Sequence, residues 1–68
     1  MLLHNIALVF FDIQEFEKAH LYLSKSIDLS IEYEMIMYIS MNYTALAELY
    51  VAERKFNKAL EYYNRSTE

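Results

Sequence analysis

The chain repeats itself at an offset of 40 residues, and this repeat limits the possible folds more than any other feature of the 68-residue sequence. Identical residues recur in the same order in both halves. The repeated pairs are Ala7/Ala47, Phe16/Phe56, Lys18/Lys58, Ala19/Ala59, Tyr22/Tyr62 and Ser26/Ser66. A repeat of this length indicates stacked copies of one supersecondary unit. The sequence therefore predicts a single module over 1–68, built from one unit at about 1–33 and a second at about 34–68.

Apolar residues in each unit recur at the i, i+3, i+4, i+7 spacing of an α-helix. In the first unit one such face consists of Leu3, Ile6, Ala7 and Phe10. The pattern predicts helices near 2–12, 16–31, 34–53 and 57–67, joined by short polar connections. Short connections make neighbouring helices antiparallel, so we expect an all-α fold of two stacked antiparallel helical hairpins. A strand over Met35–Met41, whose residues tolerate β-structure, is the competing prediction for that segment.

The composition removes several classes of function. The chain contains no cysteine, glycine or proline, which excludes disulfides, thiolate zinc sites and glycine-rich phosphate loops. Hydrophobic residues make up 56% of the chain, a high fraction for one small domain. Such a domain buries only about 60% of the surface that its unfolded chain exposes. We therefore expect part of the apolar surface to be used in contact with a partner.

The net charge is −4 and is unevenly distributed. Residues 1–53 carry eight acids against Lys18 and Lys25, whereas residues 54–68 carry four cations against two acids. An acidic chain without a basic stripe is a poor ligand for nucleic acid or an anionic membrane. The apolar start, Met1–Phe11, lacks the charged beginning and small-residue cleavage site of a signal peptide. No apolar run reaches the roughly 20 residues of a membrane span, so a cytoplasmic location is expected.

The residues at the helix crossings resemble those of tetratricopeptide repeats. In the first unit the matching residues are Ile6, Ala7, Phe10, Phe16, Ala19, Leu23 and Ser26. In the second unit they are Tyr43, Leu46, Ala47, Tyr50, Phe56, Ala59, Tyr63 and Ser66. The chain departs from the family in three ways: Gln14 and Arg54 replace the usual turn glycine, the proline between repeats is missing, and the period is 40 rather than about 34 residues. The resemblance implies a fragment of an α–α superhelix.

This resemblance also implies a concave face that is lined by the first helix of each unit and holds a protein or peptide ligand. The implied binding residues are His4, Asn5, Leu8, Phe11, Asp12, Met41, Thr44, Glu48, Val51 and Ala52. Their mixed apolar and acidic character favours an apolar or weakly basic peptide or helix. Only Asn5 stands where chaperone-binding members use a cluster of cations and Asn to clamp a carboxylate. The alternative is that these apolar residues pack against an adjoining repeat.

A second hypothesis is that the chain associates with itself as a homodimer. Stacked repeats generally need three or more units with polar caps, so the chain is expected to belong to a longer array in a regulatory or scaffold protein, or to self-associate. The residues predicted to remain uncovered on the last helix are Leu60, Tyr62 and Tyr63.

No nucleophile stands beside a base at a usable spacing, so an enzyme is not expected. Glu17 and His20 form an E-x-x-H pair, which di-metal helical bundles use twice. Their repeat equivalents are Asn57 and Leu60, so half of such a site is missing. We expect no metal and no cofactor, although a homodimer would supply a second Glu17–His20 pair.

Overall fold

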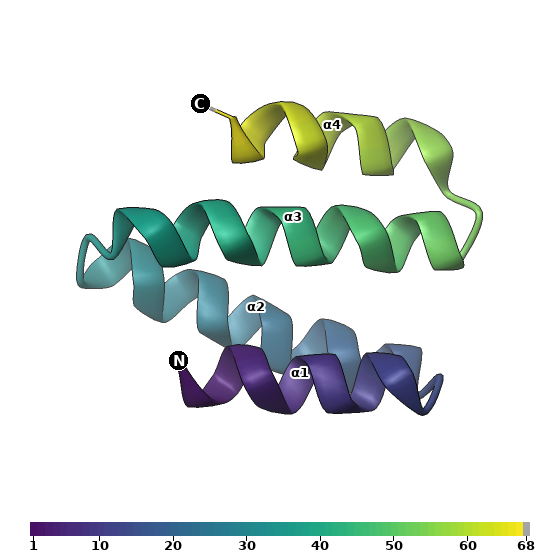
Figure 1. The fold of residues 1–68 in the computed structure, drawn as a ribbon, viewed down its shortest axis with the longest axis horizontal. Helices are drawn as coiled ribbons and strands as arrows, with labels where there is room; N and C mark the ends of the chain where they lie inside the picture. Colours follow the sequence, from purple (N-terminus) through teal and green to yellow (C-terminus); the bar gives the residue numbers. More distant parts are fainter. Residues whose placement is uncertain (68) are drawn as a thin grey trace.

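The computed structural model describes residues 1–67, and Glu68, the last residue of the predicted second unit, lies outside the described residues. Over residues 1–67 the chain forms four α-helices: α1 (Leu2–Asp12), α2 (Phe16–Glu32), α3 (Ile36–Ala52) and α4 (Phe56–Ser66). Successive helices run antiparallel, so α1 pairs with α2, and α3 with α4, as helical hairpins (Figure 1). The hairpins meet where α2 packs on α3. The predicted all-α fold of packed helical hairpins is confirmed.

The segment Met35–Met41 is helical, because α3 begins at Ile36 and continues without a break to Ala52. The competing prediction of a strand is wrong. The apolar face of this segment continues along α3 into Leu46 and Leu49, which belong to the core, and this continuity favours a helix over a β-tolerant local sequence. With these bounds, none of the helices within residues 1–67 combines the length and apolar character needed to cross a bilayer.

The connections between helices have the same backbone geometry although they contain no glycine. Gln14, Glu34 and Arg54 have φ angles of 62°, 53° and 60°, which lie in the left-handed region that glycine occupies most easily. After α3, the N–H of Lys55 donates to the carbonyl of Tyr50 at 2.8 Å, and the N–H of Arg54 donates to that of Val51 at 2.9 Å. These bonds define a Schellman motif. The turns predicted at Gln14 and Arg54 therefore keep the geometry of a glycine turn without the glycine.

The core lies between the helices of each hairpin and at the junction of the hairpins. Ala7, Ala19, Ala47 and Ala59 are 0–3% exposed, and their small side chains allow close helix crossing. Around them pack Leu23, Leu46 and Leu49, together with half-buried aromatic residues. The alanines predicted from the repeat to lie at the crossings are thus buried.

The hairpins also share a pattern of stacked aromatic rings and cations. Phe10 stacks on Tyr22 with ring centroids 5.4 Å apart, and their equivalents Tyr50 and Tyr62 stack at 5.6 Å. A cation lies over each of these four rings. The pairs are Lys18 over Phe10, Lys25 over Tyr22, Lys58 over Tyr50 and Arg65 over Tyr62, at 4.9–5.6 Å from the ring centroid. The 40-residue repeat in the sequence is therefore a repeat of contacts as well.

Candidate functional site

The candidate site is a shallow pocket between α1 and α3, which we call the α1–α3 pocket. It has a volume of about 290 Å³ and is lined by His4, Leu8, Ser40, Met41, Thr44, Ala45 and Glu48. The lining residues recur at helical spacing, since 4 and 8 on α1, and 40, 44 and 48 on α3, are each one turn apart. The pocket lies where the first helices of the two predicted units come side by side.

The structure brings together part of the predicted binding set. His4, Leu8, Met41, Thr44 and Glu48 line the α1–α3 pocket. Asn5, Asp12, Val51 and Ala52 are exposed but do not line it. Phe11 is half-buried and packs against the core, with its ring centroid 6.2 Å from that of Phe16.

Ser40 is a lining residue that was absent from the predicted set. Its hydroxyl donates to the carbonyl of Ser66 at 2.6 Å, which links the edge of the pocket to the end of α4. The one-turn spacing of Ser40 before Thr44 is the sequence signal that could have identified it.

The lining residue His4 also belongs to a buried polar network centred on Asn42, which is fully buried. His4 Nδ1 lies 2.6 Å from Asn42 Oδ1, and the hydroxyl of Ser26 donates to the same oxygen at 3.0 Å. Asn42 Nδ2 in turn donates to Ser30 Oγ at 3.3 Å. An amide oxygen can only accept hydrogen bonds, so His4 Nδ1 must carry a proton and donate it to Asn42 Oδ1. His4 thus ties α1 to α3 and is 6% exposed.

The serines and Asn42 were not predicted to act together. Ser26 and Ser30 are each 0% exposed, and their spacing of four residues places both on the side of α2 that meets α3. Within residues 1–67, every buried side-chain nitrogen and oxygen has a hydrogen-bond partner. Because an unpaired buried polar group is costly, a satisfied network of this kind favours one arrangement of α1, α2 and α3.

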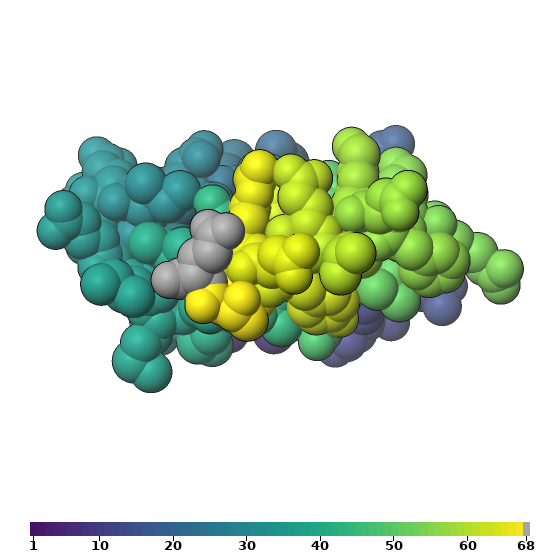
Figure 2. Space-filling view, turned by 90° about the horizontal axis from the view of Figure 1, so that it is seen from above, coloured from purple at the N-terminus to yellow at the C-terminus, as the bar shows by residue number. Residues whose placement is uncertain are grey.

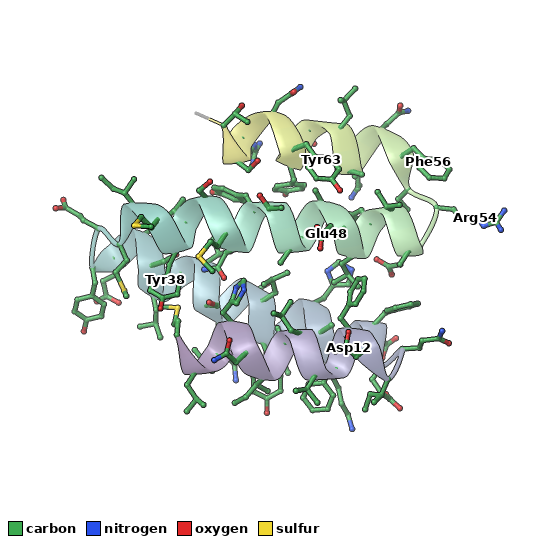
Figure 3. The ribbon with its side chains drawn as sticks, viewed as in Figure 1. Asp12, Tyr38, Glu48, Arg54, Phe56 and Tyr63 are labelled. Carbon is green, nitrogen blue, oxygen red and sulfur yellow. The ribbon has the colours of Figure 1, made fainter. Side chains whose placement is uncertain are left out.

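The charge around the pocket is acidic. The helices that form it carry Asp12 and Glu48 and contain no lysine or arginine. Figure 3 shows these two residues on the neighbouring helices α1 and α3. The cations Lys18, Lys25, Lys58 and Arg65 belong to α2 and α4, where they lie over aromatic rings. An anionic ligand would therefore meet like charge at the pocket, and a cationic ligand opposite charge.

The E-x-x-H pair of α2 does not form part of a ligand cluster. His20 Nε2 lies 2.6 Å from Glu53 Oε1, and its ring lies 5.1 Å from that of Tyr50. In the part of the chain that the structure describes, no group of three or more His, Asp or Glu side chains is placed to hold a metal ion. His20 connects the start of α2 with the end of α3.

The residues predicted for self-association are divided between two surfaces. Leu60 and Tyr63 are 60% and 38% exposed on α4. Tyr62 instead faces α3, where it is half-buried and stacks on Tyr43 and Tyr50 at 5.9 and 5.6 Å.

A scan against models of known protein families finds no match to the chain, and comparisons with curated proteins and with solved structures find none either.

Proposed function

We propose that the chain is a non-catalytic protein–protein interaction module of tetratricopeptide-like construction, which holds an apolar to weakly basic peptide or helix at the α1–α3 pocket. The observation that carries the proposal is the composition of this pocket. Leu8 and Met41 are 37% and 46% exposed at its edge, and Glu48 supplies a carboxylate. An apolar patch beside an acidic side chain suits an amphipathic helix with basic residues.

The buried polar network supports the same function. Because the contact of His4 with Asn42 holds α1 against α3, the pocket is formed before a ligand arrives, which lowers the entropy lost on binding. The proposal includes a cytoplasmic location, which the absence of cysteine favours.

A synthetic amphipathic helix of leucine and lysine with a single tryptophan tests the proposal. The chain contains no tryptophan, so fluorescence anisotropy of the peptide reports binding alone. Glu48→Lys places a cation at the pocket and is expected to weaken binding about tenfold, equivalent to about 1.4 kcal/mol. Met41→Ser should weaken it through lost apolar contact.

Glu32→Lys is the matched control, because it changes the net charge equally at an exposed residue at the end of α2, which does not line the pocket. Equal loss of affinity in Glu32→Lys and Glu48→Lys would mean that the peptide responds to net charge only. Unchanged affinity in both Glu48→Lys and Met41→Ser would refute the proposed pocket.

A further inference from the structure

The hairpins meet at one surface, which we call the central junction. It is formed by the core residues Leu23, Leu46 and Leu49, by Phe16, which packs against that core, and by two polar contacts, His20 with Glu53 and Ser26 with Asn42. Leu23, Leu46 and Leu49 are 2%, 7% and 1% exposed. The N-terminal end of α2 lies beside the C-terminal end of α3, as the contact of His20 with Glu53 shows. At an offset of 40 residues, the positions on the α2 side of this junction have equivalents on α4, and those on the α3 side have equivalents on α1.

The α2 side of the junction has its equivalent on α4, at Phe56, Leu60 and Tyr63, which we call the α4 end face. These residues follow one another at helical spacing and are 61%, 60% and 38% exposed. Figure 3 shows Phe56 where α4 begins and Tyr63 further along the helix, and Figure 2 shows α4 from its outward side. In residues 1–67 no helix covers this face, whereas α3 covers its equivalent on α2.

The α3 side of the junction has its equivalent on α1, at Leu2, Ile6, Val9 and Ile13, which we call the α1 end face. Leu2, Val9 and Ile13 are 73%, 58% and 61% exposed. Their repeat equivalents Asn42, Leu49 and Glu53 are buried or half-buried against α2. The two end faces therefore consist of the positions that fit together at the central junction.

One polar contact of the central junction is changed on both sides at the end faces. At the central junction His20 pairs with Glu53 at 2.6 Å. The equivalent pair between the end faces is Leu60 with Ile13, in which both polar residues are replaced by apolar ones. A single replacement would leave a half-buried histidine or carboxylate facing an apolar side chain, but the double replacement leaves two apolar side chains in contact.

The contact of Ser26 with Asn42 at the central junction has the equivalent Ser66 with Leu2 between the end faces. Here only one side becomes apolar, and the Ser66 hydroxyl donates to the carbonyl of Tyr63 at 2.7 Å.

The charges at the end faces are also complementary. In the arrangement of the central junction, the N-terminal end of α4 would lie beside the C-terminal end of α1. The first carries Arg54 and Lys55, and the second carries Asp12 and Glu15, all exposed. Opposite charges at the rim would favour this orientation over the reverse one.

We propose that the chain associates with a second copy of itself head to tail, with the α4 end face of one copy on the α1 end face of the next, in the manner of the central junction. Such an interface is heterologous, so each added copy leaves one α1 and one α4 end face open and the assembly lengthens with concentration. The inference concerns surfaces other than the α1–α3 pocket, and it stands or falls independently of the proposed function.

Sedimentation of the chain over a wide concentration range is the first test. The weight-average mass is expected to rise above the 8.2 kDa monomer and to continue beyond a dimer. A chain that stays monomeric at millimolar concentration would overturn the proposal, because the end faces would then receive some other partner.

Two blocked variants test the orientation. Val9→Glu with Ile13→Glu blocks the α1 end face, and Phe56→Glu with Leu60→Glu blocks the α4 end face. All four residues are more than half exposed, so the folds should survive, which circular dichroism checks. Each variant alone is expected to sediment as a monomer. Their equimolar mixture retains one intact face of each kind and should form a dimer of twice the monomer mass and stop there.

The other outcomes of the mixing experiment contradict the proposal. If either blocked variant alone still associates, the interface is isologous or lies elsewhere, and a mixture that remains monomeric excludes contact between the two end faces. Leu21→Glu is the control, since Leu21 is 51% exposed on α2 outside both end faces and its variant should associate like the original chain. In one chain, Ile13→Glu with Leu60→His should restore association that Ile13→Glu alone weakens, by copying the His20–Glu53 pair.

Discussion

Replacing Arg54 by glycine is expected to stabilise the chain. Arg54 holds a φ of 60° in the turn between α3 and α4, and its side chain is exposed and points away from the helices (Figure 3). Its backbone N–H donates to the carbonyl of Val51 at 2.9 Å. The Schellman motif thus requires a left-handed residue here, but it makes no demand on the side chain.

The expected magnitude is the difference between two effects. An L-residue in the left-handed region costs about 1–2 kcal/mol, which the glycine variant avoids. Glycine in turn loses more conformational freedom on folding, which reduces this gain by roughly 0.5–1 kcal/mol. The net gain is therefore about 0.5–1 kcal/mol, and in a domain of this size each kcal/mol raises Tm by about 4–8 °C. Gln14 and Glu34 have φ angles of 62° and 53°, so the corresponding glycine variants should give similar gains, which add if the turns are independent.

Urea unfolding followed by circular dichroism measures the change in the free energy of unfolding, at one low protein concentration because self-association would add to the apparent stability. Arg54→Ala is the matched control: it removes the same side chain but keeps the Cβ atom, so its stability should stay within about 0.5 kcal/mol of the original. If Arg54→Gly is no more stable than Arg54→Ala, the positive φ is not a source of strain and the reasoning is refuted.

Two further predictions concern buried groups. Asn42→Ala leaves the His4 Nδ1 proton without its acceptor, while the Ser26 hydroxyl keeps only the Met1 Sδ at 3.0 Å. The unpaired group should cost about 1–3 kcal/mol of unfolding free energy, and a loss below about 1 kcal/mol in urea unfolding would contradict the network. Burial, followed by the nearby Tyr62 and Glu53, raises the pKa of Tyr50 from its ordinary 10.0. Above that pH the unfolded chain holds fewer protons than the folded one, so stability should fall as the pH rises through this range. Tyr50→Phe should reduce this fall, and an identical alkaline profile for both chains would disprove the assignment.

The fold could be predicted from the sequence because its signals are periodic. The 40-residue repeat and the 3.6-residue stripes act over many positions, so the helices were located to within two residues, the largest difference being the start of α3 at Ile36 instead of 34. The strand alternative arose from the local sequence of Met35–Met41. It failed because β-propensity depends on packing context, and the packing here is that of a helix between α2 and α4.

The candidate site was less predictable because spacing assigns a residue to a helix face but not to a partner. His4 was expected at the surface of the concave face; it does line the pocket, but it is only 6% exposed and is bonded to Asn42. That bond joins residues 38 positions apart, and no local pattern predicts it. Phe11 similarly follows the spacing of the concave face, yet its bulk is accommodated in the core beside Phe16.

The polar residues of the central junction also bear on which faces can pair. If α2 of one copy met the α1 end face of another, His20 would face Ile13 in place of Glu53. If α4 met the α3 side, Leu60 would face the carboxylate of Glu53. Each of these mixed pairings buries a polar group without its partner, at a cost of about 1–3 kcal/mol per group and more for a charged one. At the central junction His20 meets Glu53, whereas under the proposed association the equivalent residues Leu60 and Ile13 meet and both are apolar. The central junction and the proposed interface can then share one helix geometry, and the end faces of another copy do not compete with α2 or α3 for the central junction.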